Sequence, residues 1–326
     1  MTVSTVLPAA NPGDIVDRIP DISVVVPVYN AAKTIAATIG SVIDQTFAGF
    51  EIVAVDDGST DASLAVLLDL AAQDSRIRVI SQRNGGVSSA RNLGADMAKA
   101  PLVAFLDSDD LWARDKLACH IELHRDEPDL AASYARIAFI AQDAATLDGA
   151  RTVSTLCGHA PLLADVLGEN PVCTASNLVV RRDWLVRLTG FDARLKFAED
   201  QEFVARLVSR GGKVGGIDEV LTGYRFSPDG LSMDHEQMHA GWRVLVDRFI
   251  DDAAVRVSLE ALYCRYLARR MLRSGGSPLR ALHFVMRGLR LDARSFMTEW
   301  RRGLATVLAA CLAPVIPSAM RRHLFA

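Results

Sequence analysis

Closely spaced cysteines are missing from this 326-residue chain, whose five cysteines are scattered along its length. Without a C-x-x-C pair, the sequence signals neither a zinc site nor a disulfide framework. The first twenty residues also lack the basic start and apolar run of a secretory signal. We therefore expect a flexible tail over residues 1–20 and a protein that resides in the reducing cytoplasm.

A long apolar run is missing from the C-terminal third. The stretch 304–316 is mostly apolar, but it contains Pro314 and has only about a dozen residues, whereas a membrane-spanning helix needs about 20. Pairs of arginines at 301–302 and 321–322 bracket it. Such a segment could lie on an anionic membrane surface, or it could belong to an ordinary helical subdomain with solvated arginines.

Lysine is absent from Gly241 onward, where fifteen arginines face six acidic residues. The net charge of this region is about +9, although the whole chain has a net charge of -3, so the preceding part carries about -12. A basic appendage on an acidic body suggests an anionic partner for the appendage, such as a membrane surface or a diphosphate group.

Short runs rich in valine and isoleucine alternate with helical patterns in the first third of the chain. The runs cover residues 21–28, 51–55, 76–80 and 101–106. Between them, residues 34–45 and 87–97 repeat apolar positions at helical spacing. This alternation predicts an α/β fold with a mostly parallel, doubly wound sheet, whose ligands bind beyond the carboxyl ends of the strands.

The alternation becomes irregular after residue 116. We expect a helix ending near residue 125, a looser region to 170, a strand over 171–180, a helix over 201–210 and a strand over 213–217. From about residue 234 the pattern is helical almost throughout. Because single cores rarely exceed 250–300 residues, we predict a main domain over 21–233 and a basic helical region over 234–326.

Polar residues follow the first two expected strands. Tyr29, after Pro27 and Val28, either stacks on a nucleobase or caps the sheet as a surface tyrosine. Turn formation and helix capping explain the polar residues 58–61. They do not explain Asp56 and Asp57, which lie at the end of the strand. There, one carboxylate can accept hydrogen bonds from a base or a ribose.

Two further acidic groups lie later in the chain. Asp107, Asp109 and Asp110 follow an apolar strand, and their mutual repulsion is offset if a cation is present. Hard carboxylate ligands suit Mg²⁺ or Mn²⁺, although a solvated acidic turn is the alternative. Glu199 and Asp200 open an expected helix, where simple helix capping competes with a chemical role.

Five segments, in this order and spacing, resemble the family 2 glycosyltransferases. They are residues 24–30, 53–61, 84–94, 105–110 and 199–200, and the resemblance covers roughly residues 21–232. It implies a GT-A nucleotide-sugar-binding fold and an inverting, metal-dependent transferase of the hexosyltransferase type. The domain over 21–233 would then be the catalytic domain.

The resemblance also implies the roles of individual residues. Val28 and Tyr29 would hold the nucleobase, Asp57 would read its edge, and Asp107 would contact the ribose or the metal-bound diphosphate. The complete set of expected donor-binding residues is Pro27, Val28, Tyr29, Asn30, Asp57, Arg91, Asp107 and Ser108. Asp109 would bind Mn²⁺ or Mg²⁺ through a D-x-D arrangement.

Asp200 matches the general base of the family. It would take the proton from the acceptor hydroxyl while the metal stabilises the departing nucleoside diphosphate. Glu199 is expected near the acceptor, and Tyr224 and Arg225, followed by residues 231–232, resemble a loop that closes over the donor phosphates. No Q-x-x-R-W pattern is present, which favours the addition of one sugar per encounter.

UDP is the expected nucleotide because it is the commonest in the family. The expected acceptor is a hydroxyl of a glycan or of a polyprenyl-diphosphate-linked oligosaccharide in polysaccharide biosynthesis. This acceptor predicts a cytoplasmic protein, peripheral at the inner face of the cell membrane, with no nucleic-acid partner.

Two alternatives remain from the residues themselves. A nucleotidyltransferase would carry a glycine-rich, lysine-containing signature after the first strand, but residues 29–34 offer Lys33 without glycine. An inactive sugar-nucleotide-binding module is opposed by the presence of Asp109 and Asp200.

Two pairs of histidines have i, i+4 spacing, at 120 and 124 and at 235 and 239. This spacing can present two imidazoles to a metal, but no H-E-x-x-H pattern accompanies it. We therefore expect both pairs on solvated helix faces, with His235 as the one remaining ligand candidate because it follows the expected closing loop.

Overall fold

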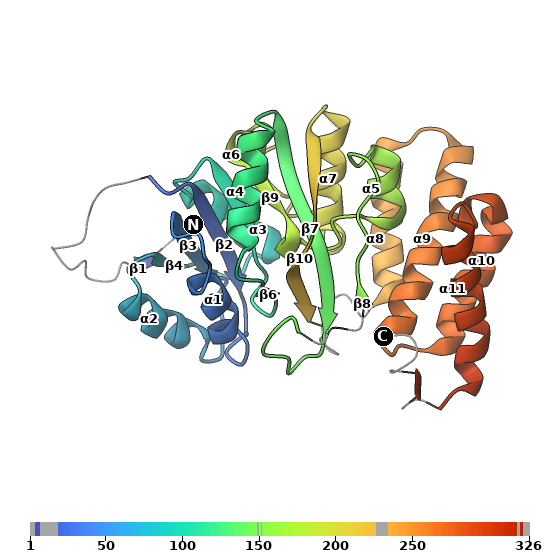
Figure 1. Cartoon of the computed structure of the whole chain (residues 1–326), viewed down its shortest axis with the longest axis horizontal. Helices are drawn as coiled ribbons and strands as arrows, with labels where there is room; N and C mark the ends of the chain where they lie inside the picture. The colour runs from blue at the N-terminus through green and yellow to red at the C-terminus, as the bar shows by residue number, and fades with distance from the viewer. Residues whose placement is uncertain are drawn as a thin grey trace. The chain divides into compact units, whose positions relative to one another are not determined.

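The computed structural model describes residues 4–6, 19–148, 150, 152–225, 234–317 and 320–321 (Figure 1). The chain divides into two compact units. The first comprises residues 1–161 and 172–225, and the second comprises residues 162–171 and 226–326. The catalytic-domain boundaries predicted from sequence stay a prediction, and the second unit takes in the segment 162–171 in addition to the C-terminal region.

A mixed β-sheet forms the centre of the first unit. Its order is β1-β4-β3-β2-β5-β9-β7-β10-β6, and β8 pairs with β7. The parallel part consists of β2 (Ile22–Val28), β3 (Phe50–Asp56), β4 (Ile77–Ser81) and β5 (Leu102–Phe105). The expected α/β class with parallel strands is therefore confirmed. Beyond β5 the sheet is mixed, because β9 pairs antiparallel with β5 and β7, whereas β7 and β10 pair in parallel.

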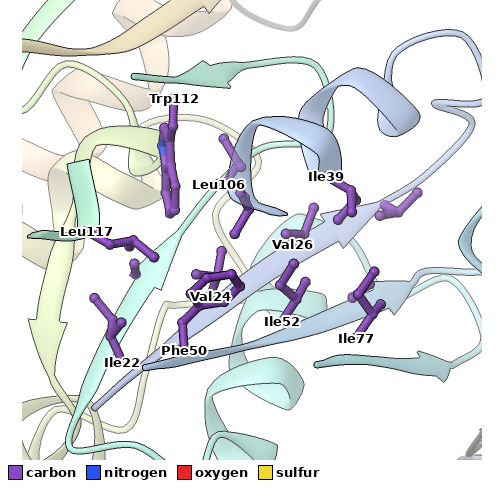
Figure 2. Close-up of a cluster of buried hydrophobic side chains, with 14 of the residues drawn as sticks. Ile22, Val24, Val26, Ile39, Phe50, Ile52, Ile77, Leu106, Trp112 and Leu117 are labelled. Carbon is purple, nitrogen blue, oxygen red and sulfur yellow. The ribbon is translucent and has the colours of Figure 1, made fainter. Parts of the chain in front are cut away.

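Every residue of β2 and β3 is buried, which explains their mostly apolar sequences. Helices α1 (Ile35–Ile43), α2 (Ser63–Gln73) and α3 (Val87–Met97) connect the parallel strands. Figure 2 shows Val24, Val26 and Ile52 in one cluster with Ile39 of α1. Val25 points to the opposite face of the sheet, where Gly94 of α3 approaches it closely.

The region between 126 and 170 contains a strand that the sequence did not predict. β7 (Leu130–Ile140) lies between β9 (Val179–Arg181) and β10 (Lys213–Arg225) in the sheet. Its alanines gave no strand signal, because alanine is depleted in strands generally and is accepted here by a buried position. The strand expected over 171–180 was mostly wrong, since Ala175–Asn177 forms the short helix η1.

The strand expected over 213–217 continues to residue 225. Its register against β7 shifts between Ile217 and Val220, and the polar residues at this irregularity hid the continuation. β10 also pairs with β6 (Leu111–Trp112) at its far end. The extension brings Arg225 beside the turn that follows β5.

His120 and His124 are buried, so the expectation of a solvated helix face was wrong. They lie on α4 (Lys116–Asp126), and both ring systems contact the Ser133 hydroxyl, at 2.7 and 2.9 Å. The Lys116 ammonium nitrogen lies 3.1 Å from His120 Nε2. Burial lowers the pKa of Lys116 to about 7 and the pKa of His124 to about 4, because the charged forms lose their contact with water. The polar groups of this core cluster form hydrogen bonds with one another instead.

The second unit is helical, as expected for the C-terminal region. It contains α5 (Leu163–Glu169), α8 (His235–Phe249), α9 (Ala253–Arg273), α10 (Pro278–Phe296), α11 (Trp300–Leu312) and the short helix η3 (Ala313–Val315). Trp242 stacks on Tyr263 at 4.6 Å and donates its indole N–H to the Leu167 carbonyl at 2.6 Å. Within the described helices, none has the length and apolar character needed to cross a bilayer.

His235 and His239 are buried in this unit, so the expected solvated face was wrong for the second pair also. His239 lies against the Trp242 ring, and its Nε2 is 3.1 Å from Glu260. Glu169 joins α5 to the long helices through ion pairs with Arg265 and Arg302, at 2.8 and 2.9 Å.

The predicted N-terminal tail falls mostly outside the described residues. Within it, β1 (Ser4–Val6) pairs antiparallel with β4, next to the edge of the parallel strands. The remaining elements of the first unit are β8 (Thr152–Val153), α6 (Arg182–Arg187) and α7 (Glu199–Ser209).

Gly94→Ala should destabilise the protein by about 1–3 kcal/mol, because the new Cβ would overlap the Val25 side chain at the α3–sheet contact. Gly40→Ala is the matched control in α1, where no neighbouring atom lies within 4 Å of the position that the new Cβ would take. Because alanine favours helix, the control should be stabilised by up to about 1 kcal/mol. Urea unfolding of both variants measures the difference, and equal effects would contradict the close approach.

Candidate active site

The loops that follow β2 and β3 are tied to each other. The Asn30 amide N–H donates to Ser59 Oγ at 3.1 Å, and Asn30 Oδ1 accepts from the Thr60 amide at 2.8 Å. Asn30 has a left-handed backbone with φ of 51°, which asparagine tolerates well. Tyr29, 51% exposed, therefore projects from a fixed loop.

Pro27 and Val28 end β2 next to this loop. β5 pairs with β2 only as far as Val25, so Pro27 lies beyond that ladder and its missing N–H costs no hydrogen bond there. The Asp57 amide donates to the Val28 carbonyl at 2.8 Å, which brings the ends of β2 and β3 together.

The Asp57 carboxylate organises the segment that leads into α3. It accepts hydrogen bonds from Gln82 Nε2 at 2.6 Å and from the amides of Gly85 and Gly86 at 2.8 and 2.9 Å. Gly86 has a φ of 88°, which only glycine adopts readily. The expected contact of Asp57 with a base edge stays a prediction, and the structure adds this loop-holding role.

The acidic turn after β5 is held by its backbone. The Asp107 amide donates to Ser176 Oγ at 3.0 Å. Thr34 and Thr38 of the α1 region donate to the Ser108 carbonyl at 2.8 and 3.1 Å. The turn is therefore fixed from two sides before any ligand binds.

Arg91 links the acidic turn to the start of α7. Its guanidinium donates to Asp107 Oδ1 at 2.6 Å and to Glu199 Oε1 at 2.8 Å, and the arginine is only 3% exposed. The same guanidinium lies 5.4 Å from the centre of the Phe191 ring. Both terminal nitrogens of the Arg91 guanidinium thus bind protein carboxylates. The expected proximity of Arg91 to the nucleotide stays a prediction.

The carboxylates of the turn are crowded. Burial and then the charge of Asp107 raise the pKa of Asp109 to about 6. Burial, together with the charges of Asp109 and Asp107, raises the pKa of Asp110 well above its ordinary value. Asp110 Oδ2 is buried without a hydrogen-bond partner among the described residues.

This donor set fits a hard divalent cation. Asp107 and Asp109 offer carboxylate oxygens of the kind that Mg²⁺ and Mn²⁺ bind, and their repulsion is the condition that a cation relieves. Asp107 keeps a quarter of its side chain exposed, with 24% accessible, so it can reach a ligand beyond the strand ends.

Arg225 holds the acidic turn from the end of β10. Its amide donates to Asp110 Oδ1 at 2.9 Å, and its guanidinium donates to the Asp109 carbonyl at 2.8 Å. Tyr224 meets Phe139 edge to face, with ring centres 6.0 Å apart. The other residues of the expected closing loop, 231–232, lie outside the described part of the chain.

Asp200 lies in the first turn of α7. Its Oδ1 accepts from the Gln201 amide at 2.6 Å. Burial and then the charge of Glu199 raise the pKa of Asp200 to about 7, while Arg91 opposes this shift. A carboxylate with this pKa can accept a proton near neutral pH.

Thr174 and Ser176 are site residues that the sequence did not indicate. Thr174 Oγ1 donates to Asp107 Oδ2 at 3.4 Å, and the Trp112 indole N–H fixes the Ser176 carbonyl at 2.8 Å. The segment was predicted as a strand, which concealed them. The available signal was Thr174 itself, because its side chain accepts the Ser176 amide as a helix N-cap.

The sequence matches a family model and several known glycosyltransferases. The model of the family "Glycosyl transferase family 2" matches residues 23–189. The chain is 32% identical over 216 residues to the putative teichuronic acid biosynthesis glycosyltransferase TuaG of Bacillus subtilis, covering 65% of this chain and 82% of that protein. It is 43% identical over 91 residues to glycosyltransferase GlyG of Streptococcus pneumoniae, covering 28% of this chain and 30% of that one.

Two solved structures share the fold. S. aureus TarS 1–349 in complex with UDP-GlcNAc has a TM-score of 0.58 at 20% identity, over 89% of each chain. Mannosyltransferase PcManGT from Pyrobaculum calidifontis, in complex with GDP-Man and Mn²⁺, has a TM-score of 0.57 at 19% identity, over 94% of this chain and 89% of that one. These likenesses confirm the expected GT-A fold class.

Arg91→Met should cost about 3–5 kcal/mol of folding stability, because it leaves Asp107 and Glu199 without their common partner. Arg187→Met is the control, since Arg187 forms an exposed ion pair with Asp183 whose loss should cost less than about 1 kcal/mol. Chemical unfolding measures both. A cost for Arg91→Met as small as that of the control would contradict the bridging role.

Proposed function

The chain belongs to glycosyl transferase family 2, and we propose that it is an inverting enzyme that transfers one sugar from a nucleotide-sugar to an acceptor hydroxyl. The observation that carries the proposal is the connection from Asp107 through Arg91 and Glu199 to Asp200. It joins an acidic turn suited to a metal-bound diphosphate with a carboxylate suited to deprotonate an acceptor.

The donor is proposed to bind across the ends of the parallel strands. Tyr29 is exposed and offers an aromatic face to a nucleobase, while Pro27, Val28 and Asn30 fix the loop that carries it. Asp57, Arg91, Asp107 and Ser108 complete the proposed donor site. UDP is the proposed nucleotide, and the TarS complex with UDP-GlcNAc is consistent with this choice.

Asp109, with Asp107, would hold Mn²⁺ or Mg²⁺. When bound, such an ion offsets the negative charge that develops on the leaving diphosphate. Arg225 keeps the turn in place through the Asp109 carbonyl and the Asp110 carboxylate, so the two ligand residues are arranged in advance. The Mn²⁺ complex of PcManGT supports the choice of metal.

Asp200 is proposed as the general base. Its carboxylate takes the proton of the acceptor hydroxyl while the acceptor oxygen bonds to the anomeric carbon and the bond to the nucleoside diphosphate breaks. Attack from the face opposite to the leaving group inverts the anomeric centre. Glu199 remains ion-paired with Arg91. Of the two neighbouring acids Glu199 and Asp200, Asp200 is therefore the one without an ion pair to arginine in the described structure.

The acceptor is proposed to be a glycan or a polyprenyl-diphosphate-linked oligosaccharide. The name of TuaG, a putative teichuronic acid biosynthesis enzyme, supports a role in polysaccharide biosynthesis. Such an acceptor would bring the protein to the inner face of the cell membrane, with the basic second unit near anionic groups. Tyr224 and Arg225, which end β10, are proposed to lie beside the bound donor.

A panel of UDP-, GDP- and TDP-sugars, with and without Mn²⁺, tests the proposal. We expect metal-dependent release of one nucleoside diphosphate, reduced at least about 100-fold by Asp109→Asn and by Asp200→Asn. Asp218→Asn is the control, because its side chain is 80% exposed and lies outside the site. The variants must retain the unfolding midpoint of the wild type for the comparison to hold.

Two results would contradict this function. No turnover of any sugar nucleotide, even with lipid-linked acceptor extracts, would indicate an inactive binding module. Formation of a nucleotide-sugar from a nucleoside triphosphate and a sugar phosphate would indicate a nucleotidyltransferase.

The pH profile of transfer tests the role of Asp200. A base must be deprotonated, and its pKa is raised to about 7, so kcat/KM should fall about tenfold per pH unit below pH 7 and level off above it. Glu199→Gln removes the neighbouring charge that raises this pKa, so it should move the inflection to lower pH. An inflection that stays in place, or moves upward, would exclude Asp200 as the titrating base.

A further inference from the structure

Helix α11 presents its bulky apolar side chains to solvent. Trp300, Leu304, Leu308, Leu312 and Val315 of α11 and the adjoining η3 are between 42% and 79% exposed. Their spacing of three or four residues places them along one face of the helix. We name this set the α11 stripe.

The inward face of α11 is made of small or polar residues. Gly303, Thr306 and Ala310 are the buried positions of the helix. A Cβ at Gly303 would contact Met297 and the Phe296 carbonyl, so the helix approaches its neighbours through its smallest residue. An ordinary surface helix places its large apolar residues inward, and the stripe reverses this pattern.

Folding of the second unit therefore does not account for the stripe. Single exposed leucines are common on protein surfaces, but a continuous row that includes a tryptophan indicates an interaction surface. The question is which partner covers it.

Exposed positive charge on α11 and on the preceding helix α10 indicates an anionic partner. Trp300–Leu312 contains no acidic residue, and the exposed Arg301 lies over the Trp300 ring at 5.4 Å. Three further exposed arginines lie on α10, and none of these four arginines forms an ion pair with a described residue: Arg280, Arg290, Arg294 and Arg301.

The acidic residues of this region are already engaged. Asp292 accepts hydrogen bonds from Ser258 and Ser295 at 2.8 and 2.6 Å, and Glu299 pairs with Arg302 at 2.8 Å. The exposed positive charge is therefore available to an external anion. A second copy of α11 would bring arginines together and would offer them no carboxylate, because Trp300–Leu312 contains no acidic residue.

We propose that the α11 stripe docks flat on an anionic lipid bilayer surface. The leucines would enter the boundary between headgroups and acyl chains, Trp300 would lie at the headgroup level, and Arg301 would face lipid phosphates. This inference deepens the proposed membrane association and gives it a specific surface. The biological role of this docking rests on the proposed function, but vesicle binding itself can be measured without sugar transfer.

The test is co-sedimentation of the full chain with vesicles of phosphatidylcholine alone and with vesicles that also contain about 30 mol% phosphatidylglycerol, which mimic an anionic membrane surface. We expect binding to the anionic vesicles that weakens in high salt. The double variant Leu304→Glu/Leu308→Glu should weaken binding at least about tenfold, because two apolar anchors are replaced by charges that the lipid repels.

Val244→Glu is the matched control, since Val244 is 51% exposed on α8, close to the 53% of Leu308. It should bind as the wild type does. Donor hydrolysis in solution should be unchanged in the double variant, which separates loss of docking from loss of the catalytic function.

Two outcomes would overturn the proposal. Equal vesicle binding by the wild type and the double variant would place the membrane contact elsewhere. Absence of vesicle binding would also overturn it, and light scattering would then identify the occupant as a second copy if the wild type is dimeric and the double variant is monomeric.

Discussion

The ion pairs of Arg91 are the constraint on which the candidate site depends. Asp107 belongs to the turn after β5, and Glu199 belongs to α7, nearly a hundred residues later in the chain. One buried guanidinium holds both carboxylates, and its planar group presents its N–H donors in a fixed geometry. One side chain therefore links the turn that carries a proposed metal ligand to the helix that carries a proposed base.

The position of Arg91 depends in turn on how α3 lies against the sheet. Gly94 allows the helix to approach Val25, and the Asn92 side chain exchanges hydrogen bonds with the backbone of Phe191 at 2.7 and 2.8 Å. Phe191 then stacks on Phe203 of α7 at 4.8 Å. Backbone, aromatic and ionic contacts thus converge on the same pair of helices, so a change in one contact is felt by the others.

Much of the first half could be predicted because its signals are local. β2, β3 and β5 are mostly apolar runs, and the polar residues at their ends stand next to them in the sequence. β7 was missed because its burial comes from neighbouring strands, which alanine-rich sequence does not reveal. The same limit hid Ser176, whose hydroxyl acts on a residue 69 positions away, and the core location of His120, which depends on Lys116 and Ser133.

The charge of the second unit shows why a residue count alone does not define a binding surface. Arg265 is 2% exposed and pairs with Glu169, so it contributes to the internal structure and is unavailable to a partner. Arg301 has the same side chain but lies exposed beside Trp300. Sequence counts both as positive charge near an apolar segment. Only the fold distinguishes the arginines that join α5 to α9 from the exposed arginines that can bind an external anion. The net charge of the region alone does not show which arginines are exposed.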